Sequence, residues 1–104
     1  MLRWIALAAL IAPAALAQPS PARQAELRHL VLHDCGSCHG LTMKGGLGRP
    51  LLPEALADKP DGFLVEVILG GVPGTPMPPW REELSASEAR WIVEQLRKGN
   101  GDAR

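Results

Sequence analysis

Apolar residues recur at helical spacing along most of the chain, and this spacing predicts a series of helices. The N-terminal helix is expected to start with Ser20 as N-cap and Pro21 at its first position, and to run to about Asp34. Residues 53–57 predict one or two helical turns, and a further helix is expected over about residues 60–69. That helix is expected to bury one apolar side, formed by Phe63, Leu64, Val67 and Ile68.

The C-terminal helix has the clearest start signal in the sequence. Ser85 and Glu88 occupy the N-cap and N3 positions of a capping box, and Gly99 is the expected residue just past the helix end. Trp91 is expected to pack this helix against the N-terminal one. The apolar stripes of the two helices are Leu27, Leu30 and Val31 on the first, and Ala89, Ile92, Val93 and Leu96 on the last.

Glycine and proline mark the segments between the helices. Four prolines lie between Val72 and Trp80, so this segment is expected to be an extended loop. A loop-rich middle is predicted by Gly36, Gly40, Gly45, Gly46 and Gly48. Because no segment shows the pattern of a strand, the predicted fold class is all-α, with three main helices and a short one.

Residues 1–17 are typical of a secretory signal peptide, with Arg3 as the basic end, an apolar stretch, and Ala15-Leu16-Ala17 as the cleavage site. The apolar stretch over residues 4–17 is 14 residues long, and spanning a bilayer takes about 20. A cleaved signal is therefore expected rather than a retained membrane anchor. The predicted mature domain is residues 18–104, exported to the periplasm.

Charge and composition narrow the function further. Without Arg3 the chain has ten Lys and Arg against eleven Asp and Glu, a formal charge of −1 with no basic excess, which argues against a nucleic-acid partner. Phe63 is the only phenylalanine and tyrosine is absent, so large core side chains are scarce. A domain this small usually needs a disulfide, a metal or a cofactor to be stable. The chain is expected to be a monomer.

The residues Cys35-Gly36-Ser37-Cys38-His39 form the C-x-x-C-H signature of covalent haem attachment. Two thiols at this spacing can bond to the two vinyl groups of one haem as thioethers. The imidazole that follows is then held beneath the iron as its proximal ligand. The sequence therefore predicts one haem c, attached through Cys35 and Cys38 with His39 on the iron.

Two other uses of a C-x-x-C pair fit less well. A thioredoxin-like redox pair follows a strand in a βαβ setting, whereas a helical pattern precedes this motif. A structural zinc site needs four ligands, and the chain has no second pair of cysteines. Haem attachment is the favoured interpretation.

Met77 is the best candidate for the second axial ligand of the iron. Pro76 and Pro78 flank it and fix their own φ angles, so the thioether would be presented by a stiff loop. Met43 lies only four residues after His39, so it would have difficulty reaching the opposite face of the haem. Met77 is therefore the predicted distal ligand.

Two further histidines, His29 and His33, lie four residues apart on or near the first helix. That spacing can bind a metal on one helix face, but two solvent-facing imidazoles are the commoner outcome, and this interpretation is favoured for both. The expected apolar wall of the haem pocket is Leu47, Leu51, Leu56, Phe63, Val67 and Ile68, for which ordinary core packing is an equal explanation. For Trp80, hydrogen bonding to a haem propionate and simple packing both remain open.

With these residues in place, the mature chain resembles a class I monohaem cytochrome c over nearly all of its length. A narrower resemblance, to the small cytochrome c55X proteins associated with denitrification and nitrite reductase, rests on four segments: residues 33–42, 44–48, 74–80 and 89–91. It implies the cytochrome c fold wrapped around one haem. It also implies a single-electron carrier rather than an enzyme.

The same resemblance implies a partner. Electron donation to a cytochrome cd1 nitrite reductase is the expected role, and the alternative is a redox or binding role in maturing the haem d1 of that reductase. The chain departs from the class I pattern at one point. Class I proteins often read Gly-Pro-x-Leu, with the proline carbonyl orienting the proximal histidine, whereas here the run is Gly48-Arg49-Pro50-Leu51. Which carbonyl accepts the N–H of His39 therefore stays open at this point.

Overall fold

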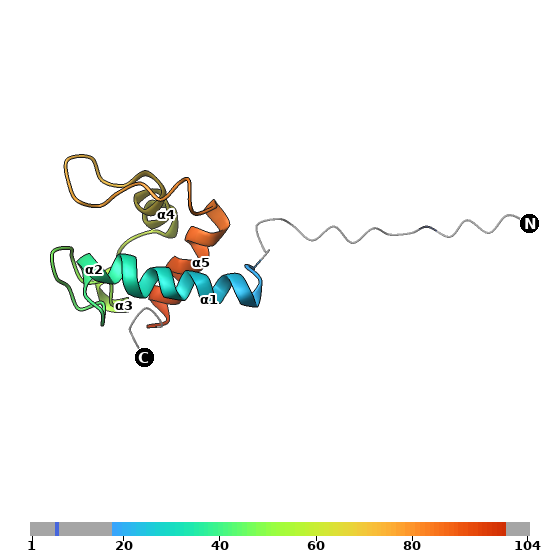
Figure 1. Ribbon diagram of the computed structural model, residues 1–104, viewed down its shortest axis with the longest axis horizontal. Helices are drawn as coiled ribbons and strands as arrows, with labels where there is room; N and C mark the ends of the chain where they lie inside the picture. The colour runs from blue at the N-terminus through green and yellow to red at the C-terminus, as the bar shows by residue number, and fades with distance from the viewer. Residues whose placement is uncertain (1–5, 7–17, 100–104) are drawn as a thin grey trace, which may run out of the picture.

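The computed structural model describes residues 6 and 18–99, and it is all-α in this part of the chain, as the apolar spacing predicted (Figure 1). The predicted signal peptide falls outside the described residues, apart from Ala6. The helices are α1 (Pro21–Leu30), the π-helical turn η2 (Val31–Cys35), α2 (Gly36–His39), α3 (Pro53–Leu56), α4 (Asp61–Gly70) and α5 (Ala86–Arg97). None of the helices described is long and apolar enough to cross a membrane.

The first helix is longer than the sequence predicted. Ser20 caps α1 by accepting a hydrogen bond from the N–H of Arg23, but the helix does not stop near Asp34. It passes through η2 and ends only at His39, so that α1, η2 and α2 form one continuous rod. Gly36, expected in a loop, is helical and buried. A single glycine costs a helix only about 1 kcal/mol, which packing and capping outweigh.

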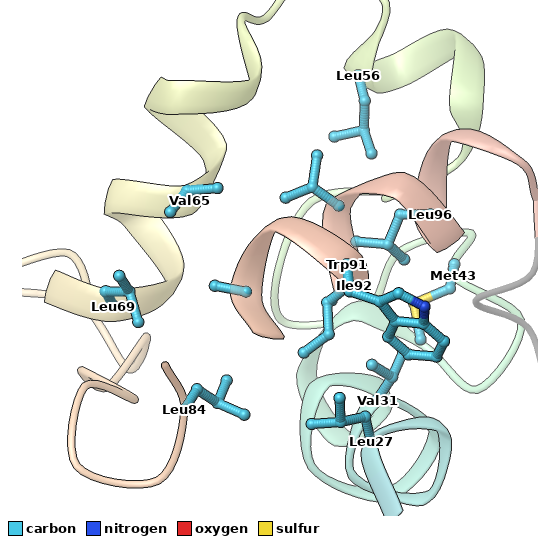
Figure 2. Close-up of a cluster of buried hydrophobic side chains, with 12 residues drawn as sticks. Leu27, Val31, Met43, Leu56, Val65, Leu69, Leu84, Trp91, Ile92 and Leu96 are labelled. Atoms are coloured by element: carbon cyan, nitrogen blue, oxygen red, sulfur yellow. The ribbon is translucent and has the colours of Figure 1, made fainter. Parts of the chain in front are cut away.

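The core forms where α1 and η2 cross α5. Leu27 and Val31 on the first helix are buried, as are Trp91 and Ile92 on the last (Figure 2). The guanidinium carbon of Arg28 lies 5.2 Å from the centre of the Trp91 ring, in cation–π contact. The predicted packing of the C-terminal helix on the N-terminal one is confirmed.

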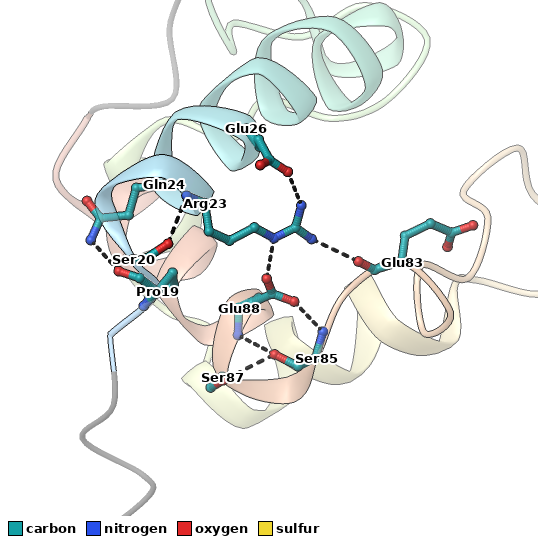
Figure 3. Close-up of polar contacts among 9 residues, drawn as sticks. All are labelled: Pro19, Ser20, Arg23, Gln24, Glu26, Glu83, Ser85, Ser87 and Glu88. Carbon is teal, nitrogen blue, oxygen red and sulfur yellow. Dashed lines mark hydrogen bonds and ion pairs between the residues drawn. The ribbon is translucent and has the colours of Figure 1, made fainter.

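A polar clamp ties the start of α1 to the start of α5 (Figure 3). The guanidinium of Arg23 donates to the carboxylates of Glu88 and Glu26 and to the backbone carbonyl of Glu83. Glu88 also belongs to the capping box of α5, which the structure confirms with both of its hydrogen bonds to Ser85. The rod that ends in the C-x-x-C-H motif is thereby fixed to the last helix at a second point.

Helix α4 buries a side that the prediction located only in part, since Leu64 and Ile68 pack against the core beside Val65 and Leu69. Val65 and Leu69 are buried against the core, whereas Phe63 is 55% exposed and Leu64, Val67 and Ile68 are only partly buried. The helix is apolar on nearly all sides, so its spacing alone does not identify the side that meets a neighbour. Contact with α5 selects the Val65–Leu69 side.

The segments that carry the predicted iron ligands lie at one end of the molecule. In Figure 1, α2 with the loop after it and the long loop between α4 and α5 lie opposite the N-terminal end of α1. The first contains Cys38 and His39 and directly follows Cys35, the last residue of η2, and the second contains Met77. The fold therefore carries both predicted ligand segments on one side of the helical core.

Candidate haem site

The two cysteines lie on the last turns of the N-terminal rod. Cys35 ends η2 and Cys38 lies in α2, so they share one helix face at i, i+3 spacing. Both are free thiols. Between them, Ser37 turns its hydroxyl back onto the carbonyl of Asp34, at 2.8 Å. The helix thus holds two unlinked thiols side by side, as attachment to a single flat group requires.

The surroundings of Cys35 keep its thiol neutral. Burial, followed by the negative charge of Asp34, raises the pKa of Cys35 to about 11. Redox-active and metal-binding cysteines instead require the thiolate, which a lowered pKa provides. This environment argues against the thioredoxin-like interpretation and suits a thiol that ends as a thioether.

The imidazole of His39 is held by a single backbone group. Its Nδ1 lies 2.7 Å from the carbonyl oxygen of Arg49. Because a carbonyl oxygen only accepts, Nδ1 carries a proton, and in the neutral imidazole Nε2 then keeps its lone pair. A histidine in this tautomer has one nitrogen ready for a metal, and its hydrogen bond raises the basicity of that nitrogen. The orienting carbonyl is therefore that of Arg49, one residue before Pro50.

Backbone hydrogen bonds place the Arg49 carbonyl by folding the loop of residues 40–50, called the glycine loop below, over the end of α2. The N–H of Gly48 donates to the carbonyl of Cys38 at 2.7 Å, and the N–H of Gly45 donates to that of His39 at 2.8 Å. Gly48 also lies close to the imidazole ring. A Cβ at this position would be 2.8 Å from both Cε1 and Nδ1 of His39, closer than such atoms pack. The glycine pattern alone did not predict this role for Gly48, although its place in the Gly-x-Pro-Leu run was a signal.

The Met77 loop is extended, as its prolines predicted, and two hydrogen bonds reach Met77 itself. The N–H of Val72 donates to the carbonyl of Met77 at 3.2 Å, and the N–H of Met77 donates to the hydroxyl of Thr75 at 3.3 Å. Gly71 begins the loop with φ +66°. A Cβ there would lie 2.7 Å from the nitrogen of Pro79 and 2.8 Å from the carbonyl oxygen of Met77. Only a glycine lets the loop pack this closely on the end of α4, a role that the sequence analysis did not assign.

The remaining candidates separate into core and surface. Met43 is 2% exposed and belongs to the hydrophobic cluster, consistent with its rejection as a ligand (Figure 2). Of the expected pocket wall, Leu56 is buried in the core, while Leu51, Val67 and Ile68 are partly buried. Leu47 is 77% exposed. Leu41, which was not part of the predicted pocket wall, is 57% exposed. Trp80 packs against the core.

These features fit a haem. Leu41 and Leu47 expose large apolar side chains in and beside the loop that orients His39, although leucine is usually buried. Next to them stand two free thiols and an imidazole whose Nδ1 is held by a backbone carbonyl, with Nε2 on the other side of the ring. A flat apolar group bonded at Cys35 and Cys38 would cover such side chains. The chemistry of the donors and the apolar surface agree.

Comparisons with known proteins agree with a haem at this site. Residues 22–96 match the family model described as cytochrome C oxidase, cbb3-type, subunit III. A protein of Paracoccus denitrificans named cytochrome c55X is 54% identical over 99 residues, which are 94% of this chain and 96% of that protein. A second cytochrome c55X, from Pseudomonas aeruginosa, is 57% identical over 78% of this chain and 68% of its own length. The chain belongs to the cytochrome c55X family.

Two further likenesses extend this result. A solved structure of a c-type cytochrome, NirC, superposes with a TM-score of 0.78 at 56% identity, covering 81% of this chain and 99% of that one. A dihydro-heme d1 dehydrogenase of Pseudomonas aeruginosa is 37% identical over 91% of this chain, which is 19% of the length of that protein. The cytochrome c fold is thereby confirmed. Family membership makes this chain an electron-transfer protein and implies haem c as its cofactor.

Proposed function

We propose that this chain is a periplasmic electron carrier with one haem, bound covalently through Cys35 and Cys38 and held on its iron by His39 and Met77. The observation that carries the proposal is the 2.7 Å hydrogen bond from Nδ1 of His39 to the carbonyl of Arg49. It fixes the tautomer and the direction of the proximal ligand before any other group binds. That arrangement is typical of a histidine that ligates a metal.

A haem bound here would accept and release one electron reversibly, as its iron changes between the ferric and ferrous states. His39 and Met77 would both hold the iron, so the exchange would stay simple, with no position left for a substrate. His39 is oriented by Arg49, and Met77 is confined by the prolines on either side of it. Ligands held in this way need to move little when the electron arrives or leaves. A histidine–methionine pair also raises the reduction potential relative to other ligand sets.

The proposed electron acceptor is a cytochrome cd1 nitrite reductase of denitrification, the partner implied by the c55X resemblance. Support comes from relatives of over 50% identity that share the c55X name and from the structural likeness to NirC. Direct evidence would be the reduction of purified reductase by the reduced carrier under anaerobic conditions. Failure of this transfer, with the haem in place, would redirect the search to another acceptor.

A second candidate function is a redox role in the maturation of haem d1. The 37% identity to part of a dihydro-heme d1 dehydrogenase favours it, because a dehydrogenase must pass electrons to an acceptor. A small carrier that resembles a segment of that enzyme suits such a role. Deleting the gene separates the two functions. A reductase that lacks haem d1 would favour maturation, whereas a complete reductase that is starved of electrons would favour donation.

The covalent haem itself is tested by expressing the protein in a periplasm with active cytochrome c maturation. We expect a coloured protein whose haem stays with the polypeptide in acidified acetone, with a low-spin spectrum in both oxidation states. The matched variant, Cys35→Ser with Cys38→Ser, should lose its haem to the solvent. Haem extracted from the wild-type protein, or a colourless product, would contradict the proposal.

A further inference from the structure

Two exposed histidines lie against each other on the N-terminal rod. His29 is in the last turn of α1 and His33 is in the π-helical turn η2, four residues further along the chain. The centres of their imidazole rings are 4.1 Å apart, and the ring planes are inclined by 43°. The two side chains therefore share one face of the rod, across the point where the α-helix becomes a π turn.

Neither imidazole has a competing partner in the described part of the chain. No hydrogen bond or ion pair to His29 or His33 is found among residues 18–99. The nearest acidic residue one turn earlier on this face, Glu26, already pairs with Arg23 at 2.9 Å. Both side chains are exposed, so rotation about χ1 and χ2 could turn one nitrogen from each ring toward the same point.

Two imidazoles at i, i+4 on a helix are a chelating pair for divalent transition metals, as in the zinc-binding H-E-x-x-H helix. Imidazole is a good ligand for Cu²⁺, Ni²⁺ and Zn²⁺, and of these Cu²⁺ binds most tightly to a given nitrogen site. No group of three or more His, Cys, Asp or Glu side chains that could hold a metal occurs in the described residues. Water would complete the coordination, which leaves the site open and reversible.

We propose that His29 and His33 form a surface site for a divalent transition-metal ion, and that Cu²⁺ binds there most tightly. The ion would bridge α1 and η2 and so tie down the π turn, where the N–H of Gly36 donates to the carbonyl of Val31. This turn ends at Cys35, so the metal would stiffen the segment that leads directly into the C-x-x-C-H motif. The site is separate from the proposed haem ligands, and it does not depend on Met77.

The test compares four oxidised, haem-loaded proteins: the wild type, His29→Gln, His33→Gln and the double variant. Titration with CuCl₂ and with ZnCl₂ by calorimetry at neutral pH should give one site in the wild type, with Cu²⁺ the tighter. Each single substitution should weaken binding by about tenfold or more, because the chelate is lost. Saturating Cu²⁺ should raise the wild-type Tm by a few degrees and leave that of the double variant unchanged.

The chain provides its own control, since its only other histidine, His39, is present in all four proteins. The N-terminal amine and the haem propionates are likewise common to all. Equal affinity in the wild type and the double variant would place the ion elsewhere and overturn the proposal. Loss of binding in one single variant but not in the other would also overturn it, because one imidazole would then suffice. Unchanged haem spectra and unchanged metal-free Tm values would show that the substitutions leave the fold intact.

Discussion

The two segments expected to hold the iron are built very differently. On the His39 side, the bonds that fix the ligand are short: 2.7 Å from Nδ1 to the carbonyl of Arg49, and 2.8 Å from the N–H of Gly45 to the carbonyl of His39. On the Met77 side, the bonds that reach the ligand are 3.2 and 3.3 Å, and both involve its backbone alone. His39 also ends a helical rod, whereas Met77 lies in a loop.

The difference indicates where a change of ligation would begin. The position of His39 is set by α2, by the glycine loop and by the proposed covalent attachment beside it, so several contacts must fail together before it moves. The position of Met77 depends on its flanking prolines and on the close packing of Gly71 against the loop. We therefore expect the Met77 side to be the more easily disturbed, with effects on the haem that differ in kind from those on the His39 side.

Exchanging each proposed ligand for alanine should have the largest effect. Met77→Ala should leave a covalently bound haem with an open iron position, gain rapid carbon monoxide binding, and lower the reduction potential by roughly 0.1–0.2 V. His39→Ala should instead reduce the yield of mature holoprotein. Spectroscopy and redox titration measure both outcomes. Met43→Leu, in the buried core, is the matched control, and a Met77→Ala spectrum identical to the wild type would refute the ligand assignment.

Gly71→Ala should disturb the Met77 side without touching the ligand. The new Cβ would overlap the backbone of residues 77–79, and the positive φ adds about 1–3 kcal/mol of strain. We expect lower stability together with a lower potential and faster carbon monoxide binding. Gly74→Ala is the matched control, because Gly74 also has a positive φ, +79°, but has no atom within 4 Å of its Cβ position. Equal redox properties in the two variants would show that strain alone is responsible.

Gly48→Ala should act on the His39 side with a smaller effect of opposite sign. The added methyl group would push the imidazole and lengthen its bond to Arg49, which makes Nε2 less basic. A weaker donor stabilises ferric iron less, so the potential should rise by on the order of tens of millivolts. Redox titration beside Gly62→Ala, which has open space at its Cβ, provides the comparison. A fall in potential would show that the bond to Arg49 is not the relevant contact.

The smallest effect is expected from acid acting on the clamp that fixes the N-terminal rod to α5. Hydrogen bonding to Arg23 lowers the pKa of Glu88, so this carboxylate stabilises the fold above its ordinary pKa of 4.5. The contribution is lost as the pH falls through the lowered value. Glu88→Gln keeps a residue suited to the capping box and should cost about 1 kcal/mol at neutral pH.

Denaturant titrations of the wild type and of Glu88→Gln, from neutral pH down through the lowered pKa of Glu88, measure the contribution of this carboxylate to the free energy of unfolding. The difference between wild type and Glu88→Gln should shrink toward zero in acid. Glu26→Gln is the control, because Glu26 also pairs with Arg23 but has a side chain that is 65% exposed. A difference that stays constant with pH would assign the effect to capping rather than to the ion pair.

Particular residues show how far the sequence could lead. The caps at Ser20 and Ser85, the apolar stripes of the first and last helices, and the proline loop were all predicted, because each depends on neighbours within a few residues. The buried side of α4 was predicted only in part: Leu64 and Ile68 pack against the core, but Val65 and Leu69 are the buried residues, since an apolar helix needs a partner to select its inner face. The first helix was predicted too short, because Gly36 was expected to lie in a loop. The helix instead continues to His39, where backbone N–H groups of the loop after α2 donate to its last carbonyls.

The sequence by itself determined the all-α class and the spacing of two thiols and an imidazole, since these follow from local caps and from residue identity. Only the tertiary structure decided that Arg49 supplies the carbonyl for His39 and that Gly71 makes room for the Met77 loop. Both depend on the path of a backbone that returns from several residues away. The energy that selects such a path comes from contacts between distant segments, and no local pattern contains it.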